Sequence, residues 1–192
     1  MPRQLAVEKS DINPIFAFSS SLGWFAVAWR AEQLHALVFG FADGAAAAGA
    51  LLELSPSGRE APSGWVDIER NPSAASRDAC RLAERLRAYA NGGRDEFLDI
   101  PLASHRVTRF QETVLQQCRR IGYGQTCTYG QLAANAGSPQ AARAVGAVMA
   151  RNRVPLIVPC HRVIGSSGTL RGYSGCGGAA MKRRLLELEG VL

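Results

Sequence analysis

Negative charge is scarce in the second half of this 192-residue chain. Residues 105–192 contain 3 acidic and 12 basic residues, whereas residues 1–104 contain 13 acidic and 10 basic ones. A basic half joined to a mildly acidic half indicates that the second half meets a polyanion, and nucleic acid is the first candidate. The alternative is an arginine-rich surface that only keeps the protein in solution.

Long apolar runs, a signal region and metal-ligand spacings are also missing. No stretch approaches the roughly 18 apolar residues of a membrane span, and no apolar signal region follows residues 1–4. The five cysteines are odd in number and irregularly spaced, so we expect reduced thiols in a cytoplasmic protein rather than a disulfide framework. The three histidines form no ligand spacing with them, so we expect no metal ion.

The first half has the pattern of a small sheet with two helices. Alternating apolar residues predict strands over residues 15–18, 23–29 and 34–39, the last two forming a hairpin. Helical patterns cover residues 44–54, which Asp43 can cap, and 74–90. Residues 55–73 are typical of a loop with a short strand at 65–68, and residues 97–102 of a strand or linker. The change in charge places a domain boundary near residue 104.

Two capping signatures begin helices in the second half. Thr108-x-x-Gln111 precedes apolar residues at helical spacing, and Thr128-x-x-Gln131 starts a short helix through residue 135. Ser138-Pro139 then supplies an N-cap followed by proline at the first helical position, which predicts a helix over 139–151. Two short helices joined by a glycine turn form a helix-turn-helix pattern.

The helix predicted over 139–151 lacks the long polar side chains with which major-groove helices read bases. Ala142, Ala144 and Gly146 would let its backbone approach a narrow groove, with Arg151 as a further DNA contact near its end. Arg143 could occupy the space of an extruded base. The alternative is a small-residue helix packed on another helix with Arg143 in solvent, and this helix alone favours neither interpretation.

An apolar segment over residues 154–158, kept out of helix by Pro155, leads to Cys160 and His161. A cysteine at the end of such an extended segment would lie at the floor of a pocket, and the adjacent imidazole can help to take a thiol proton. Cys-His by itself is more typical of a buried structural cysteine. A glycine-rich loop over 164–175 could close over a planar ligand. A last helix over 179–189 ends near Glu189, whose carboxylate could orient the histidine.

These residues together resemble the O6-alkylguanine-DNA alkyltransferases, or methylated-DNA–protein-cysteine methyltransferases. The matching segments cover nearly all of residues 105–192: 124–133, 137–146, Asn152, 159–165, 172–173 and 185–190. The first half resembles the family only loosely. The resemblance implies an α/β fold, with a ribonuclease-H-like domain over 1–104 and a helix-turn-helix (winged-helix-like) catalytic domain over 105–192.

The resemblance also implies direct-reversal repair. One alkyl group passes irreversibly from guanine O6 in duplex DNA to Cys160, which His161 deprotonates through a water while Glu189 orients the histidine. Asn152 braces the turn before the cysteine, and Tyr129 pushes the flanking phosphate and donates to the flipped guanine. No cofactor is implied. We expect a monomer that could bind DNA cooperatively, without membrane contact, near the nucleoid or in the nucleus of a eukaryote.

Carried over by position, Arg143 fills the vacated base stack, while Val163, Tyr173 and Ser174 read the base edge. Two departures from the family stand out. Arg153 replaces a frequent proline and is expected to contact phosphate, and the segment 173–182 is about two residues longer than usual, which places Cys176 near the pocket mouth.

Three other functions are weighed against this one. A lesion sensor that binds without repair is disfavoured by the cysteine, because such relatives carry tryptophan at that position. A transcription regulator is disfavoured by the recognition helix, which lacks base-reading side chains. A thiol hydrolase would turn over repeatedly on an ester.

Overall fold

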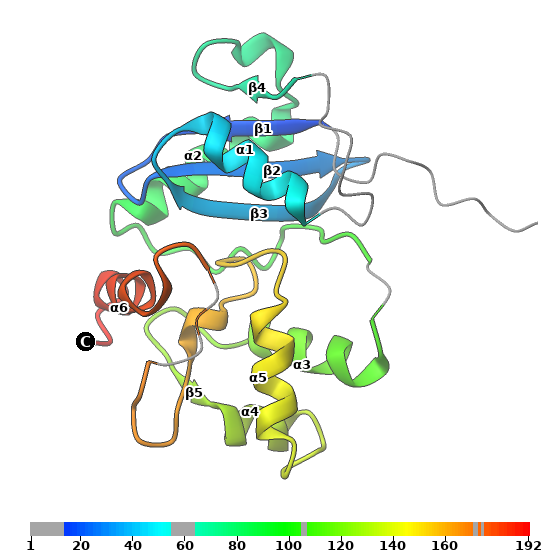
Figure 1. The fold of residues 1–192 in the computed structure, drawn as a ribbon, viewed down its shortest axis with the longest axis vertical. Coiled ribbons are helices and arrows are strands. Elements are labelled where there is room, and N and C mark those ends of the chain that lie inside the picture. Colours follow the sequence, from blue (N-terminus) through cyan, green and yellow to red (C-terminus); the bar gives the residue numbers. More distant parts are fainter. Residues whose placement is uncertain (1–13, 55–63, 105–106, 171–172, 174) are drawn as a thin grey trace, which may run out of the picture.

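The computed structural model describes residues 14–54, 64–104, 107–170, 173 and 175–192. The first half is built on a four-stranded sheet of order β3-β2-β1-β4 (Figure 1). Its strands are β1 (Ile15–Phe18), β2 (Trp24–Arg30), β3 (Gln33–Phe41) and β4 (Val66–Asp67). β2 runs antiparallel to both β1 and β3, whereas β4 pairs with β1 in parallel. Ala31 and Glu32 have φ angles of 47° and 63°, so the hairpin between β2 and β3 closes through two left-handed residues.

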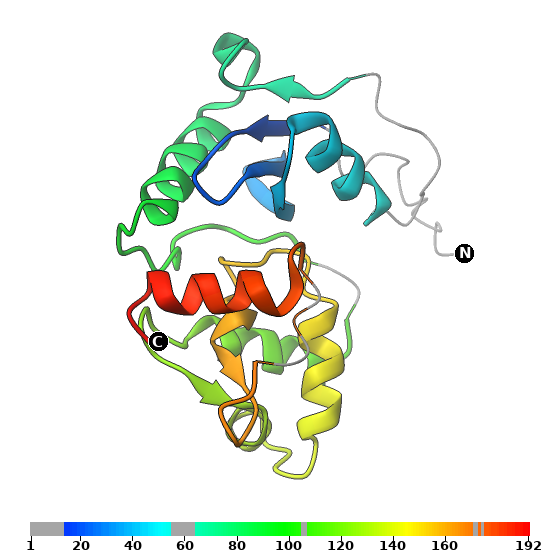
Figure 2. The same ribbon diagram turned by 60° about the vertical axis from the view of Figure 1, so that its left-hand side comes forward.

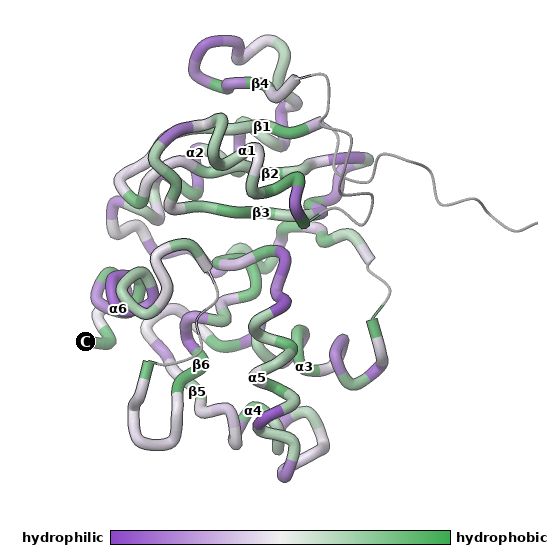
Figure 3. The backbone as a smooth tube through the Cα atoms, in the orientation of Figure 1, coloured by the Kyte–Doolittle hydropathy of each residue, from purple (hydrophilic) through white to green (hydrophobic). Residues whose placement is uncertain are grey.

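Helices α1 (Gly44–Glu53) and α2 (Arg77–Ala90) pack on opposite faces of this sheet. Alternation along the strands separates the two faces, because successive side chains point to opposite sides. On the α1 face, small residues such as Ala17, Ala26 and Ala36 meet Ala47. On the other face, the phenylalanines of β1 and β2 join a larger apolar cluster with α2. Figure 3 shows the hydrophobic colour along β1 to β3.

The start of α1 makes a testable prediction about packing. Asp43 caps this helix by accepting from Ala46 N at 2.8 Å, as expected. A Cβ at Gly44 would lie 2.6 Å from Trp65 Cη2 and 2.9 Å from Trp24 Cζ3. Gly44→Ala should therefore lower the free energy of unfolding by about 1–3 kcal/mol through overpacking. Urea denaturation followed by fluorescence measures this change.

Gly49 in the same helix provides the matched control. It is exposed, and an added Cβ would have no described atom within 4 Å. Gly49→Ala should therefore raise the free energy of unfolding by about 0.5–1 kcal/mol, the helix propensity gained. Equal effects of the same sign in the two variants would contradict the packing argument.

The second half packs short helices around the segment 152–164 (Figure 2). Its elements are α3 (Arg109–Arg119), β5 (Cys127–Thr128), α4 (Tyr129–Asn135), α5 (Ala142–Ala150), the 3-10 turn η2 (Cys160–Arg162), β6 (Val163–Ile164) and α6 (Gly178–Leu188). β5 and β6 pair in parallel. Both predicted capping boxes are confirmed, with Thr108 and Gln111 at α3 and Thr128 and Gln131 at α4. None of the helices in the described ranges has the length and apolar character that a membrane span needs.

Helix α5 begins three residues later than the sequence indicates. Ser138 N donates to Ala133 O and Gly137 N donates to Ala134 O, with Gly137 at φ 77°. This is a Schellman motif, so Ser138 closes α4 instead of capping α5. Pro139 therefore lies in a separate turn, and the N-cap of α5 is Ala141, whose side chain has no acceptor.

Two other expectations are wrong in detail, and an open alternative is decided. Helix α2 begins at Arg77 because Ser76 caps it, and the residues before it form a short 3-10 helix, η1 (Pro72–Ala74). Residues 97–102, expected to be a strand or a linker, form a linker, in which only Leu102 makes a bridge, to Leu34. The segment 154–158 is a tight turn and not extended: Val158 N donates to Val154 O, and Leu156 has φ 71°.

One apolar cluster runs through both halves. It includes phenylalanines of β1 and β2, Tyr89 and Leu86 of α2, and residues of α3 to α6 such as Val145 and Leu185. Leu37 N on β3 also donates to Arg153 O at 2.8 Å. In both Figure 1 and Figure 2, α6 lies beside the junction of the two halves. The segment that carries Cys160 therefore contacts residues of both the first and the second half of the chain.

Candidate active site

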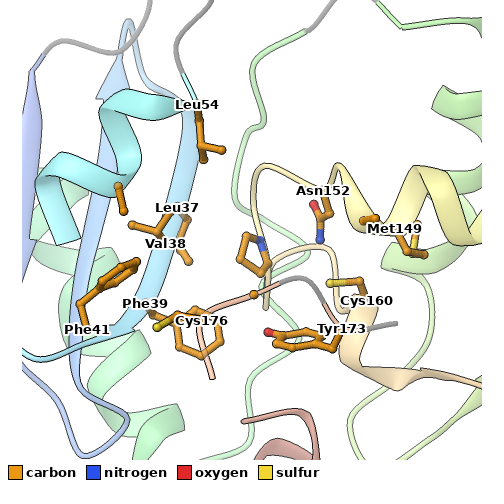
Figure 4. A pocket seen from close by; sticks show the side chains of 14 residues that line it. Leu37, Val38, Phe39, Phe41, Leu54, Met149, Asn152, Cys160, Tyr173 and Cys176 are labelled. Atoms are coloured by element: carbon orange, nitrogen blue, oxygen red, sulfur yellow. The ribbon is translucent and has the colours of Figure 1, made fainter. Parts of the chain in front are cut away.

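Cys160 lines a cavity of about 230 Å3 between the two halves. The sulfur side of this cavity is formed by Cys160, Tyr173 and Asn152, and the opposite wall by Val38 and Phe39 of β3 (Figure 4). Cys160 is 8% exposed. This thiol was expected at the floor of a pocket, and the structure shows it nearly buried in the lining of one.

Asn152 holds the turn that precedes the cysteine. Its Nδ2 donates to Val158 O at 2.7 Å, and its Oδ1 accepts from Val154 N at 3.1 Å. One side chain therefore fixes both ends of the turn, which is the bracing contact expected for Asn152. The same turn brings Cys160 N within 2.8 Å of Val158 O.

His161 and Glu189 lie in direct contact, as predicted. His161 Nε2 is 2.9 Å from Glu189 Oε1, and both side chains are buried. Arg162 donates to the same carboxylate with two nitrogens, Nε at 2.9 Å to Oε2 and Nη2 at 2.9 Å to Oε1. Tyr89 Oη donates to Oε1 at 2.5 Å. The other ring nitrogen, His161 Nδ1, is buried and has no hydrogen-bond partner within the described residues.

The charges in this cluster fix the protonation states at neutral pH. Burial alone would raise the pKa of Glu189, but hydrogen bonds from His161 and Arg162 outweigh it and hold the pKa at about 2. Burial lowers the pKa of His161, and since Arg162 already compensates the carboxylate, the imidazole is neutral. Burial raises the pKa of the Cys160 thiol, while a hydrogen bond from Asn152 and the charge of Lys182 act in the opposite direction. A protonated thiol next to a neutral imidazole needs that imidazole as its base.

Comparison with known proteins places this site in a family. Residues 109–191 match the family described as 6-O-methylguanine DNA methyltransferase, DNA binding domain. The methylated-DNA–protein-cysteine methyltransferase of Methanosarcina acetivorans is 44% identical over 131 residues, which cover 68% of this chain and 77% of that protein. The chain belongs to the methylated-DNA–protein-cysteine methyltransferase family.

Other members of the family agree with this assignment. The Haemophilus influenzae protein of the same name is 38% identical over 135 residues, 66% of this chain and 74% of that one. The crystal structure of Mycobacterium tuberculosis OGT in complex with DNA aligns with a TM-score of 0.67 and 35% identity over 91% of each chain. The mixed α/β fold described above is therefore the fold of the methyltransferase family.

The predicted DNA-binding residues of this methyltransferase lie on α5 or just after it, except Tyr129, which lies at the start of α4. Arg143 and Ala144 are exposed, and Arg151 is exposed just after the helix ends. Val145, on the opposite side of the helix, is buried in the core. Ala142 and Gly146 are half-buried, and a Cβ at Gly146 would lie 3.9 Å from the ring of Tyr129 at the start of α4. The structure thus leaves Arg143 on the solvent side of a helix with a small-residue surface.

The predicted base-reading residues are only partly described. Tyr173 lines the cavity, and its hydroxyl is buried with no partner among the described residues. Val163 O accepts a hydrogen bond from Lys182 Nζ. Ser174 lies outside the described residues. Cys176 lines the same cavity as Cys160, and its Sγ contacts Gly40 O at 3.3 Å, so the longer loop does bring a second thiol to this pocket.

Sequence reasoning assigned no role to three buried residues around the methyltransferase site. Arg162 was visible only as the next residue after Cys-His, and Lys182 as one more basic residue. Tyr89 fitted the apolar stripe of a helix. A signal for Arg162 existed, because a charge directly after a buried Cys-His pair needs an acid, and this half has only three. Arg153 was expected at phosphate but donates to Leu54 O at the end of α1.

Proposed function

We propose that this protein repairs DNA by direct reversal, moving one alkyl group from guanine O6 in duplex DNA to Cys160. The observation that carries the proposal is the arrangement at the cavity. A cysteine faces the open space, and the adjacent His161 has Nε2 fixed by Glu189 and Nδ1 still available to take a proton. Family membership supports the reaction class, and the geometry supports the choice of residues.

In the proposed reaction, His161 Nδ1 takes the thiol proton through one water. The Cys160 sulfur then attacks the alkyl carbon in line, forming an S–C bond as the O6–C bond breaks. The leaving guanine accepts a proton from the phenol of Tyr129, whose raised pKa, due to burial, keeps it protonated. His161 then gives up the thiol proton to solvent and Tyr129 regains a proton from solvent, so no co-reactant is consumed. The product is a thioether, whose S–C bond is not cleaved by hydrolysis, so each molecule acts once.

DNA would approach the α4–α5 face. We propose that α4 and α5 form the helix-turn-helix unit of a catalytic domain over residues 105–192, with the small residues of α5 against the minor groove. For residues 1–104 we propose a ribonuclease-H-like domain, supported by the sheet order β3-β2-β1-β4 and its parallel last strand. We further propose that the protein acts on DNA as a monomer. We also propose a reducing compartment, since all five cysteines are free.

The direct test is to incubate the protein with a duplex oligonucleotide that carries O6-methylguanine and to measure its intact mass. We expect an increase equal to one CH2 group, complete at one equivalent of lesion, with the modified peptide containing Cys160. Modification of another cysteine, or multiple turnover, would contradict the proposal.

Arg143 should matter only when a base has to be extruded. Holding a base out of the stack costs a few kcal/mol, so Arg143→Ala should slow transfer from duplex DNA by about 10-fold or more. Free O6-benzylguanine needs no extrusion, and its reaction with the same variant should be unchanged. Single-turnover rates with the two substrates measure this. Unchanged rates with both would favour a merely solvated Arg143, and equal losses would indicate a folding defect.

A further inference from the structure

We propose that Tyr89, in the first half of the chain, is a positioning residue of the acceptor site. Its hydroxyl holds the Glu189 carboxylate in place, so that His161 keeps its proton on Nε2 and offers Nδ1 to the thiol. This inference rests on the proposed role of Cys160 and deepens it by adding a component from the other half.

The contact spans the chain. Tyr89 lies in the last turn of α2, 100 residues before Glu189 and 72 before His161. Its Oη donates to Glu189 Oε1 at 2.5 Å and lies 3.4 Å from His161 Nε2. Tyr89 Oη and His161 Nε2 therefore both contact the same carboxylate oxygen, Glu189 Oε1. Burial raises the pKa of Tyr89 far above its ordinary range, so the phenol is protonated and can donate at neutral pH.

The ring of Tyr89 has separate reasons to be where it is. It packs edge-on against Phe97, with centroids 5.8 Å apart, and against Tyr123, with centroids 6.0 Å apart, and the residue is 1% exposed. A phenylalanine would satisfy all of these apolar contacts. The hydroxyl is the part of the side chain that packing does not require, and its partner is the carboxylate that orients the base.

Charge explains what the hydroxyl contributes. Among the described residues, the charged and titratable groups facing His161 are Glu189, Arg162, Lys182, Tyr89 and the neighbouring thiol. Farther from His161, Arg162 Nη1 donates to Glu96 Oε2 at 3.5 Å, and the Arg162 guanidinium lies over the ring of Tyr123. The phenol satisfies part of Glu189 without adding charge. The carboxylate then attracts the imidazole proton less strongly, which favours a neutral histidine.

The test is Tyr89→Phe, compared with the unmodified protein in single-turnover transfer from methylated duplex across pH. We expect the rate at neutral pH to fall by about 3- to 10-fold, the effect of one hydrogen bond. We also expect the acid limb of the pH profile to move to higher pH, because the less satisfied carboxylate stabilises imidazolium. A loss of packing alone would lower the amount of active protein without moving that limb.

Tyr123→Phe is the matched control. Tyr123 belongs to the same aromatic cluster, but its hydroxyl donates to Leu188 O at 3.0 Å and not to the carboxylate. Its pH profile should be that of the unmodified protein. A Tyr89→Phe variant with unchanged rate and unchanged acid limb overturns the inference. Absence of transfer in the unmodified protein would instead refute the proposed function.

A second measurement needs no variant to fold. In the unmodified protein with 15N-labelled histidine, NMR should show His161 as the neutral Nε2–H tautomer at pH 7. A proton on Nδ1, or an imidazolium at that pH, overturns the inference even if Tyr89→Phe cannot be purified.

Discussion

Cys160→Ala will abolish transfer of a labelled methyl group from duplex DNA, while binding to the same DNA persists. The sulfur is the only group of this side chain that can accept the alkyl carbon, so no residual rate is expected. The residue is nearly buried, and removing one sulfur atom leaves a small cavity with little effect on the fold. Gel transfer of label together with a DNA-binding titration measures both quantities.

Cys176→Ala is the control for this result. Cys176 lines the same cavity, but it is exposed and lies beside Gly40 on the first half. Its replacement should leave transfer intact. Transfer that survives in Cys160→Ala and disappears in Cys176→Ala would move the acceptor to the longer loop and refute the proposed site.

Arg162→Ala should be the most destabilising single replacement near the site. Arg162 is 2% exposed, and besides Glu189 it donates to Ile121 O at 2.6 Å. Its removal leaves the buried Glu189 carboxylate without the cation that pairs with it and the part-buried Ile121 carbonyl without this donor, which costs about 3–5 kcal/mol in the free energy of unfolding. Urea denaturation at pH 7 measures this loss.

The pH dependence of that loss identifies its cause. The pKa of Glu189 is about 2 in the folded protein against an ordinary 4.5, so its stabilisation is complete above pH 4.5 and is lost as pH falls toward 2. The difference between Arg162→Ala and the unmodified protein should therefore shrink over that interval. Arg183 pairs with Glu187 at 4.0 Å on the surface of α6, and Arg183→Ala should cost at most about 0.5 kcal/mol. A pH-independent loss in Arg162→Ala would point to packing instead of charge.

Local signals in the sequence were reliable where both partners lie within a few residues. The capping boxes at Thr108 and Thr128 and the cap at Asp43 are all present. The start of α5 predicted from Ser138-Pro139 was wrong because two local motifs compete for the same serine. Ser138 belongs to the motif that ends α4. The prediction of an extended segment over 154–158 was wrong because the turn found there depends on Asn152, whose side chain forms hydrogen bonds with both ends of it.

Charge counting was the less reliable guide. Of the basic residues that make the second half positive, Arg162 and Lys182 are buried and bond to Glu189 and Val163 O. Arg119 donates to three backbone carbonyls of the linker, those of Phe97, Leu98 and Ile100. The charge that faces a polyanion is accordingly smaller than composition indicates. The contact of Tyr89 with Glu189 was beyond sequence reasoning, because its partner lies 100 residues away.

Strand β3, from the first half of the chain, forms one wall of the cavity beside Cys160. Val38 and Phe39 stand across the cavity from the sulfur, and Leu37 is tied to Arg153 just before the turn that carries it. The room beside the sulfur is thus limited by residues encoded far upstream. How bulky a lesion the protein can clear is set partly by a hairpin that carries none of the chemistry.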